Sequence, residues 1–205
     1  NRADRTADRV TMEHVLYPRP GYPFTLRLSL EYALVDGGLR VRTTTTNVGA
    51  EACPFGAGAH PWLRTGTASI DTARLHVPAT AAMWSDERCI PNRTGPVAGT
   101  ELDFRVERPI GDVRIDNAFT GLARDADGIA RVSLAAPDGH GVEVWFDRAY
   151  PYVMLSTGDV LPDVDRRSIA IEPMSCPPNA FQSGESVIRL EPGATFSGTW
   201  GIATR

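Results

Sequence analysis

The sequence predicts an all-β protein, a large antiparallel β-sandwich formed by a single domain over residues 1–205. Three observations support this prediction. Residues 24–35, FTLRLSLEYALV, alternate apolar and polar side chains, which is the period of a strand with one buried face. The DGG sequence at 36–38 is a hairpin turn signal, and the alternation resumes in LRVRTTTTNV at 39–48. Finally, the sequence contains no convincing helical stripe longer than two turns.

The remaining predicted strands are short and are mostly separated by clusters of Gly, Pro, Asp and Asn. They cover residues 68–77, 100–106, 129–134, 142–146, 152–156, 168–171, 186–190 and 194–202. Residues 86–90 and 117–123 are interpreted as single helical turns at most. We see no internal repeat and no linker, which is why one domain is predicted.

The charge, the hydropathy and the lack of lysine argue against several classes of function. A formal net charge of −4 without any basic run argues against a nucleic-acid partner. No apolar stretch reaches the length of a membrane span, so no membrane partner is predicted. All 21 basic residues are arginine, which excludes Schiff-base and pyridoxal phosphate chemistry and also a P-loop, because each requires a lysine.

The three cysteines, Cys53, Cys89 and Cys176, are odd in number, far apart and never in a C-x-x-C pair. This spacing predicts neither a metal site nor a disulfide framework. We expect small, buried apolar side chains in a reducing compartment, and therefore a cytoplasmic protein.

His60 differs from the other three histidines because Pro61 follows it directly, in the stretch FGAGAHPWL. Proline disfavours helical backbone at the preceding residue, and Gly56 and Gly58 allow close approach of a ligand or of other backbone. An extended histidine at the mouth of a sheet suits a proton donor or acceptor in a pocket. The alternative is a structural, hydrogen-bonded histidine.

Glu172 lies in the same kind of context, at the end of the apolar run IAI and directly before Pro173. A carboxylate at the end of an apolar strand is costly unless it has a partner or a role. Partial burial would raise its pKa toward the range of a general base. The alternative is an ion pair with Arg166 or Arg167.

Asp116, in VRIDNAFTGL, is a third candidate. It could accept hydrogen bonds from a polyhydroxylated ligand, or it could be an ordinary turn or N-cap aspartate. His14 and His76 alternate with apolar neighbours and are interpreted as strand-face residues, and His140 is interpreted as a solvated turn residue.

Together, several segments resemble the aldose 1-epimerase (galactose mutarotase) family. They are PGYPFTLRLSLEYAL, GLRVRTTTTNVGAEACPFGAGAHPWL, IPNRTGPVAGTELDFR, IDNAFTGL and IEPMSCPPNAF, and they occur in the order that the family has. The resemblance implies a galactose mutarotase-like supersandwich that interconverts α and β anomers of a free hexose such as glucose or galactose, with no cofactor. It implies that Glu172 is the general base, His60 the general acid and Asp116 a residue that binds sugar hydroxyls.

The resemblance covers roughly the C-terminal two thirds of a family member. The N-terminal portion, from which an arginine and a further histidine contact the sugar, has no match here. We therefore expect a fold incomplete at the N-terminus, with a partner or a missing segment covering an open sheet edge. Two alternatives remain open. One is a non-catalytic carbohydrate-binding sandwich that stacks sugars on the aromatic residues Trp62, Trp84, Trp145 and Phe119, and the other is a hexose-6-phosphate 1-epimerase relative.

Overall fold

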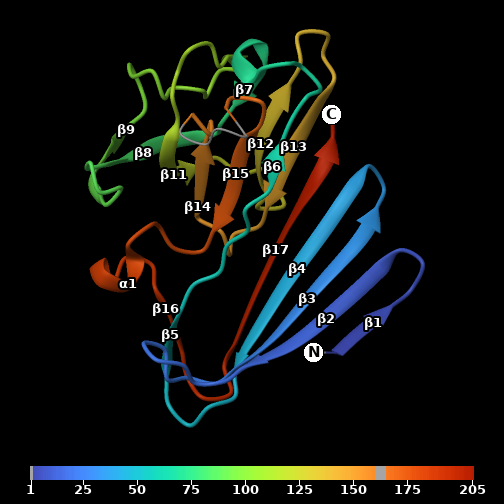
Figure 1. Cartoon of the computed structure of the whole chain (residues 1–205), viewed down its shortest axis with the longest axis vertical. Coiled ribbons are helices and arrows are strands. Elements are labelled where there is room, and N and C mark those ends of the chain that lie inside the picture. Colours follow the sequence, from blue (N-terminus) through green and yellow to red (C-terminus); the bar gives the residue numbers. More distant parts are fainter. Residues whose placement is uncertain (1, 160–164) are drawn as a thin grey trace.

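The computed structural model describes residues 2–159 and 165–205, and within these residues the chain is built almost entirely of antiparallel strands (Figure 1). The strands form a nine-stranded sheet, a six-stranded sheet and a two-stranded ribbon. The predicted all-β architecture with large antiparallel sheets is confirmed.

The nine-stranded sheet has the order β1-β2-β3-β4-β17-β13-β12-β7-β10. Its strands are β1 (Arg2–Arg5), β2 (Arg9–Leu16), β3 (Leu26–Val35), β4 (Gly38–Asn47), β17 (Thr195–Thr204), β13 (Gly141–Phe146), β12 (Ala130–Ala135), β7 (Arg74–His76) and β10 (Arg108–Pro109).

The six-stranded sheet has the order β6-β15-β14-β11-β8-β9 and lies in the upper part of Figure 1. Its strands are β6 (Trp62–Leu63), β15 (Ile169–Met174), β14 (Tyr152–Ser156), β11 (Asp116–Leu122), β8 (Ala79–Ser85) and β9 (Pro91–Pro96). The ribbon pairs β16 (Ile188–Leu190) with β5 (Cys53–Phe55).

One continuous core joins the two large sheets. The six-stranded sheet contributes the inward side chains of alternate residues, such as Phe119, Leu155 and Ile171, each fully buried. The nine-stranded sheet contributes Leu134 and Phe146 from its central strands. Neighbouring residues on a strand point to opposite faces of the sheet. The residues that alternate with these buried ones therefore point to the other face of the six-stranded sheet.

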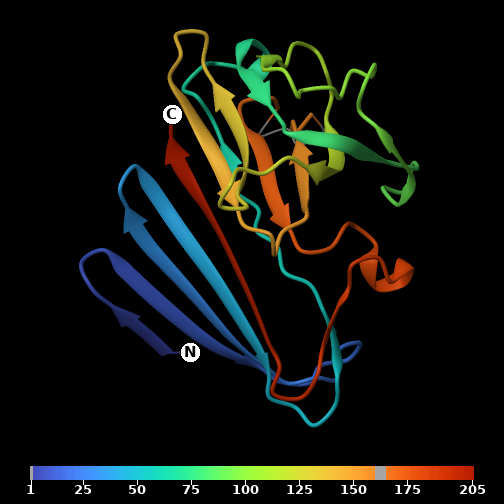
Figure 2. The ribbon, with the colours of Figure 1, turned by 180° about the vertical axis from the view of Figure 1, so that it is seen from behind.

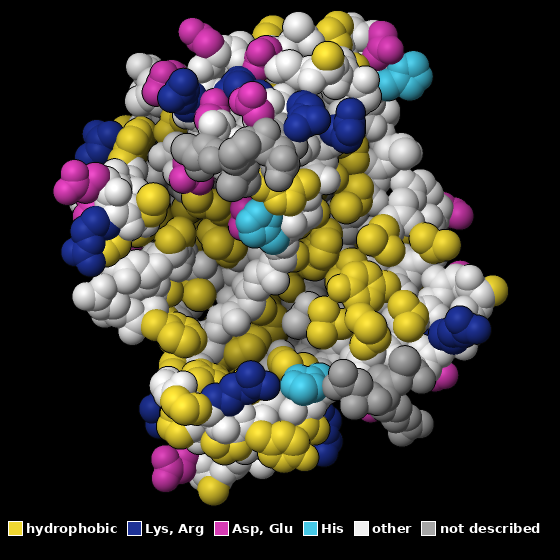
Figure 3. Space-filling view, viewed as in Figure 1, with side chains coloured by type: hydrophobic (Ala, Val, Ile, Leu, Met, Phe, Trp, Pro, Cys, Tyr) yellow, Lys and Arg dark blue, Asp and Glu magenta, His cyan; other side chains and the backbone are white. Residues whose placement is uncertain are grey.

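The β1–β4 end of the nine-stranded sheet extends away from the six-stranded sheet (Figures 1 and 2). One of its faces carries charged and polar residues, among them Glu31, which pairs with Arg40. The other face is apolar but only partly covered: Met12 is 44% exposed and Leu34 is 65% exposed. Hydrophobic side chains gather over β3 and β4 in the space-filling view (Figure 3).

Three of the sequence predictions are wrong in whole or in part. Residues 100–106 form turns, because Thr100 and Asp103 hydrogen-bond nearby backbone instead of leaving it to a ladder. Residues 117–123, interpreted as a helical turn, belong almost entirely to β11. The first half of 68–77 is the short 3-10 helix η1 (Ile70–Thr72), since the Ser69 hydroxyl accepts from the backbone N–H of Asp71.

Helical structure is sparse in the described residues: besides η1 there is α1 (Ala180–Ser183). Neither helix of the part that the structure describes has the length and apolar character needed to cross a membrane. Of the cysteines, Cys53 is buried as expected, whereas Cys176 is half-buried and Cys89 is exposed in a turn, so the expectation of burial holds for one of the three.

Candidate active site

His60 and Glu172 face each other across an antiparallel pair of strands. In the β15–β6 register Ile169 lies opposite Leu63 and Ala170 lies opposite Trp62. The same register continues beyond β6, since the Ile171 N–H donates to the Pro61 carbonyl at 3.1 Å, and it reappears at an isolated bridge between Gly58 and Met174.

The backbone around His60 is held on both sides by this pairing. The Ala59 N–H donates to the Pro173 carbonyl at 3.1 Å, so the two residue pairs that contain a proline lie side by side. Each proline lacks an N–H, which is why the hydrogen bonds run through its carbonyl and through its neighbours. The two X-Pro segments singled out in the sequence therefore form one structural unit.

The side chains of the pair are in direct contact. His60 Nε2 lies 3.2 Å from Glu172 Oε1. The imidazole is 58% exposed and the carboxylate only 14%, so the histidine lies on the solvent side of the acid. Trp62 stacks on the imidazole with ring centroids 5.7 Å apart, which further restricts its orientation.

Glu172 lies on the outer face of the six-stranded sheet because Ile171 points into the core and successive side chains alternate. Its cross-strand neighbour is Met154 of β14, and Met174 packs on the same face. This largely apolar setting desolvates the carboxylate and raises the pKa of Glu172, while the nearby His60 opposes the rise and the negative charge of Asp116 adds to it.

Asp116 is the first residue of β11 and pairs with Ser156 of β14. Asp116 is exposed, and its side chain lies on the same outer face of the sheet as Glu172. This follows because Ala118, two residues further along β11, pairs with Met154, and Met154 in turn pairs with Glu172. The turn or N-cap interpretation of Asp116 does not hold, since the residue begins a strand. The structure therefore brings all three predicted site residues to one face of one sheet.

One of the two arginines proposed as alternative partners of Glu172, Arg166, is bonded to other residues. The guanidinium of Arg166 bonds to Asp71 and Asp159, not to Glu172. The partner of Glu172 is instead His60.

Sequence reasoning missed the neighbours that shape the site. Met154, Met174 and Tyr152 lie on the same face, and the Tyr152 hydroxyl bonds to Glu185 and Ser186 at 2.9 Å each. The period of two in β14 would have placed Met154 and Tyr152 on one face, but only the cross-strand register shows that this face is the one with Glu172.

An open groove of about 380 Å³ adjoins the pair at the Gly58–Met174 bridge. Its lining is mostly apolar and consists of Gly56, Ala57, Gly58, Met174, Cys176, Pro177, Asn179, Ala180 and Phe181. A Cβ at Gly56 would lie 2.6 Å from the Cys176 sulfur, so a larger residue here would force the Cys176 side chain to move. Across the described residues, no group of three or more His, Cys, Asp or Glu side chains converges as metal ligands.

Comparison with known proteins identifies a family that matches almost the whole chain. A family model described as aldose 1-epimerase matches residues 2–203. The uncharacterized protein YihR of Escherichia coli K12 is 32% identical over 192 residues, which cover 93% of this chain and 60% of that protein. The chain spans about 60% of the length of the curated relatives that it matches.

Solved structures show the same fold. A GalM/aldose epimerase homologue from C. elegans superposes with a TM-score of 0.84 at 16% identity, covering 100% of this chain and 68% of that one. Galactose 1-epimerase from Lactobacillus acidophilus NCFM gives a TM-score of 0.80 at 22% identity, covering 100% and 65%. Because the family model matches nearly every residue, and solved structures show the same fold, the chain belongs to the aldose 1-epimerase family.

Proposed function

We propose that the protein is an isomerase, an aldose 1-epimerase that interconverts the α and β anomers of a free hexose such as glucose or galactose. The observation that carries the proposal is the 3.2 Å contact between His60 and Glu172 on an exposed sheet face. An imidazole and a carboxylate with a raised pKa form a pair that can exchange protons in either direction near neutral pH.

The proposed reaction needs two proton transfers at two oxygens bonded to the same carbon. The Glu172 carboxylate takes the proton of the anomeric hydroxyl while the His60 imidazolium gives a proton to the ring oxygen. The bond from the anomeric carbon to the ring oxygen breaks, and its electron pair stays on that oxygen. The hydroxyl oxygen becomes the carbonyl oxygen of the open-chain aldehyde.

Reclosure reverses the roles of the two groups. After the carbonyl end rotates, neutral His60 takes the proton from the hydroxyl that attacks, and protonated Glu172 returns a proton to the carbonyl oxygen. Both residues end in their starting states, so no cofactor or outside proton is required. The two reacting oxygens are separated by only two bonds, which suits an acid and a base that touch in the free protein.

Asp116 is proposed to hold the sugar rather than to react. Its carboxylate lies exposed at the start of β11, with β14 between it and β15. A carboxylate there can accept hydrogen bonds from ring hydroxyls and so fix the anomeric carbon over the acid–base pair.

Polarimetry tests the proposal directly. We expect the protein to speed the decay of optical rotation of freshly dissolved α-D-glucose or α-D-galactose in proportion to its concentration. The matched control is His60→Gln, whose amide reaches about as far as the imidazole Nε2 but cannot shuttle protons. A wild-type rate equal to that of buffer with both sugars would overturn the assignment, and glucose 6-phosphate as a third substrate tests the phosphorylated class.

Trp62 motivates a second candidate, a non-catalytic carbohydrate-binding sandwich. Its ring offers an aromatic face beside His60. Calorimetry separates the two candidates, because galactose binding without faster mutarotation supports this second function and contradicts the first.

A further inference from the structure

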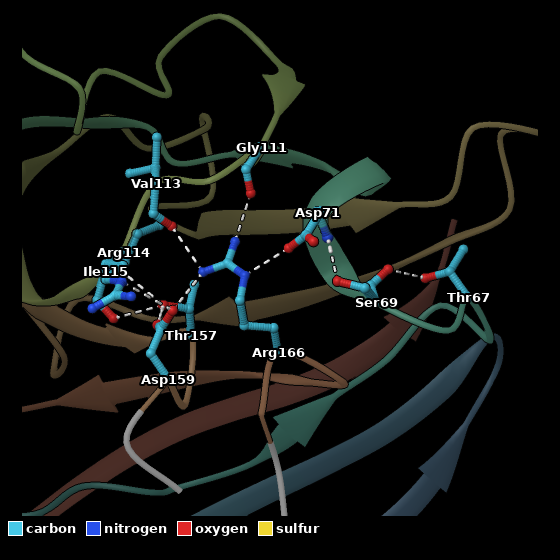
Figure 4. A network of polar contacts seen from close by, with 10 residues as sticks. All are labelled: Thr67, Ser69, Asp71, Gly111, Val113, Arg114, Ile115, Thr157, Asp159 and Arg166. Carbon is cyan, nitrogen blue, oxygen red and sulfur yellow. Dashed lines mark hydrogen bonds and ion pairs between the residues drawn. The ribbon is translucent and has the colours of Figure 1, made fainter. Parts of the chain in front are cut away.

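Arg166 joins three separate segments through its guanidinium (Figure 4). Nε donates to Asp71 Oδ1 at 2.6 Å, and Nη1 donates to Asp159 Oδ1 at 2.8 Å. Nη1 also donates to the Val113 carbonyl at 3.2 Å, and Nη2 donates to the Gly111 carbonyl at 2.6 Å. The side chains of Arg166 and Asp159 are only 16% and 14% exposed, so this ion pair is largely shielded from water, whereas Asp71 is 48% exposed.

The backbone of Arg166 is itself in an uncommon conformation. Its φ is +55°, in the left-handed region that residues other than glycine rarely adopt. Its carbonyl accepts from the N–H of Ile70 at 2.8 Å, next to Asp71 of η1. Arg166 is thus anchored through both its backbone and its side chain, and such over-determined positions often serve the geometry of a neighbouring site.

The network leads to Asp116 along two routes. Along the chain, Val113, whose carbonyl accepts from Arg166, lies three residues before Asp116. Through space, Asp159 accepts a short hydrogen bond from the Thr157 hydroxyl, and this hydroxyl accepts from the Ile115 N–H at 3.0 Å.

Asp116 depends on this support more than Glu172 does. Glu172 lies inside β15, opposite Met154 on one side and His60 on the other, so two ladders hold it. Asp116 is at the end of its strand. It pairs with Ser156 on one side, and the β11–β8 ladder begins only at Phe119. The segment before Asp116 must therefore fix its position from outside the sheet.

We propose that Arg166 is a positioning residue that fixes Asp116 relative to Glu172, so that a bound sugar is held in register with the acid–base pair. The inference rests on the proposed function. Arg166 has no contact with His60 or Glu172 in the structure, and it acts through Asp116 alone.

The test is a double-mutant cycle with galactose in which kcat and KM are measured separately. Arg166→Lys keeps the positive charge but loses the planar fork, so it cannot bond all four acceptors at once. We expect KM to rise about tenfold with a smaller change in kcat, because the sugar is held less accurately. In an Asp116→Asn background the same substitution should change KM less than about twofold.

Arg105→Lys is the matched control. Arg105 also forms a two-point pair with an aspartate, Asp103, but on the surface and away from the site. This variant should keep the wild-type KM. An Arg166→Lys enzyme with wild-type KM, or an effect undiminished by Asp116→Asn, would overturn the proposal.

A second readout needs no catalysis. The titratable groups that face Glu172 are His60 and Asp116, and its other neighbours Met154 and Met174 do not titrate. Asp116→Asn should lower the pKa of Glu172 in an NMR titration, and Arg166→Lys should also lower it, since a released Asp116 no longer holds its negative charge near Glu172. An unchanged Glu172 pKa in Arg166→Lys contradicts the positioning role.

These measurements separate the two failures. If the wild-type protein does not speed mutarotation, the proposed function fails and the NMR titration alone decides the role of Arg166. If Arg166→Lys does not fold, Asp71→Ala removes just one of the four contacts and should raise KM by a smaller factor. A wild-type KM in a folded Asp71→Ala protein then counts against the proposal.

Discussion

In both the six-stranded sheet and the β1–β4 end of the nine-stranded sheet, apolar and polar side chains alternate along the strands, but the resulting apolar faces are covered to different degrees. In the six-stranded sheet the apolar face is sealed in the core, with Phe119 fully buried, and the opposite face carries His60 and Glu172. In β1–β4 the charged face meets solvent, and the apolar face is also partly open, with Leu34 65% exposed.

The difference shows that alternation decides which side chains share a face but not whether a second layer covers that face. Coverage is a tertiary property, and it determines what each face can do. Only a sheet with one sealed face can hold a desolvated carboxylate rigidly on its other face. The following experiments compare the two regions, beginning with the largest expected effect.

Glu172→Gln should remove most of the activity. The amide cannot accept the anomeric proton, so kcat/KM should fall on the order of a thousandfold. Glu31→Gln is the control from the β1–β4 end, since Glu31 is also ion-paired on a sheet face but lies far along the other sheet. Polarimetry on both variants checks the contrast, and a Glu172→Gln enzyme that retains wild-type activity contradicts the role of Glu172 as base.

Phe119→Ala should strongly destabilise the fold. It empties a fully buried site, and the free energy of unfolding should fall by about 3–5 kcal/mol. Leu34→Ala, on the open apolar face, should change it by less than about 0.5 kcal/mol. Urea unfolding followed by circular dichroism measures both. Equal losses would mean that the apolar face of β1–β4 is covered in solution.

Activity and folding should respond to different ranges of acid. The pKa of Glu172 is raised above its ordinary 4.5, so kcat/KM should fall as the pH drops through a value higher than that of a free glutamate. The pKa values of Asp71 and Asp159 are lowered from 3.8, so their stabilising contribution is complete above that value and is lost only as the pH falls through their folded-state pKa values.

A window of mildly acid pH should therefore exist in which the protein is folded but inactive. Parallel pH series of polarimetry and far-ultraviolet circular dichroism would detect it. Loss of activity and of structure at the same pH would show that the ionisation of Glu172 does not limit the reaction.

Substitutions on the open apolar face should have the smallest effect. Met12→Ser combined with Leu34→Ser should lower the binding of a hydrophobic dye while leaving kcat/KM unchanged, because these residues lie on the β1–β4 end and not on the face with Glu172. Dye fluorescence at constant protein concentration checks this, and unchanged fluorescence would mean that the dye does not reach the face.

The sequence was enough to predict a strand where the local pattern of side chains determines the structure. Strong alternation predicted most of β3, β4, β13 and β17, and Pro61 marked the end of regular pairing after His60. The strand end expected at Glu172 was wrong, because β15 continues through Pro173, which pairs with Val153, to Met174. The pattern of residues 100–106 resembled these strands, yet hydroxyl and carboxylate bonds to nearby backbone made turns of it. The period of apolar residues does not reveal that side chains compete with a neighbouring strand for the backbone hydrogen bonds.

The contacts of the site could not be predicted in this way. The partner of Glu172 is set by the register between β15 and a strand of two residues, β6, which is too short to show any period. The same holds for Arg166, which the sequence offered as a partner for Glu172 and which the fold assigns to Asp71 and Asp159. Long-range pairing, not residue type, chose between these partners.

The ladder that joins β6 and β15 has a consequence for how this chain tolerates insertion and deletion. Adding or removing one residue between Gly58 and Trp62 would reverse the parity of the strand and turn the imidazole toward the core, while the carboxylate stayed outside. A shift of two residues would preserve parity but set glycine or tryptophan opposite Glu172. The contact between His60 and Glu172 thus depends on the number of residues between Gly58 and Trp62 as much as on the identity of those residues.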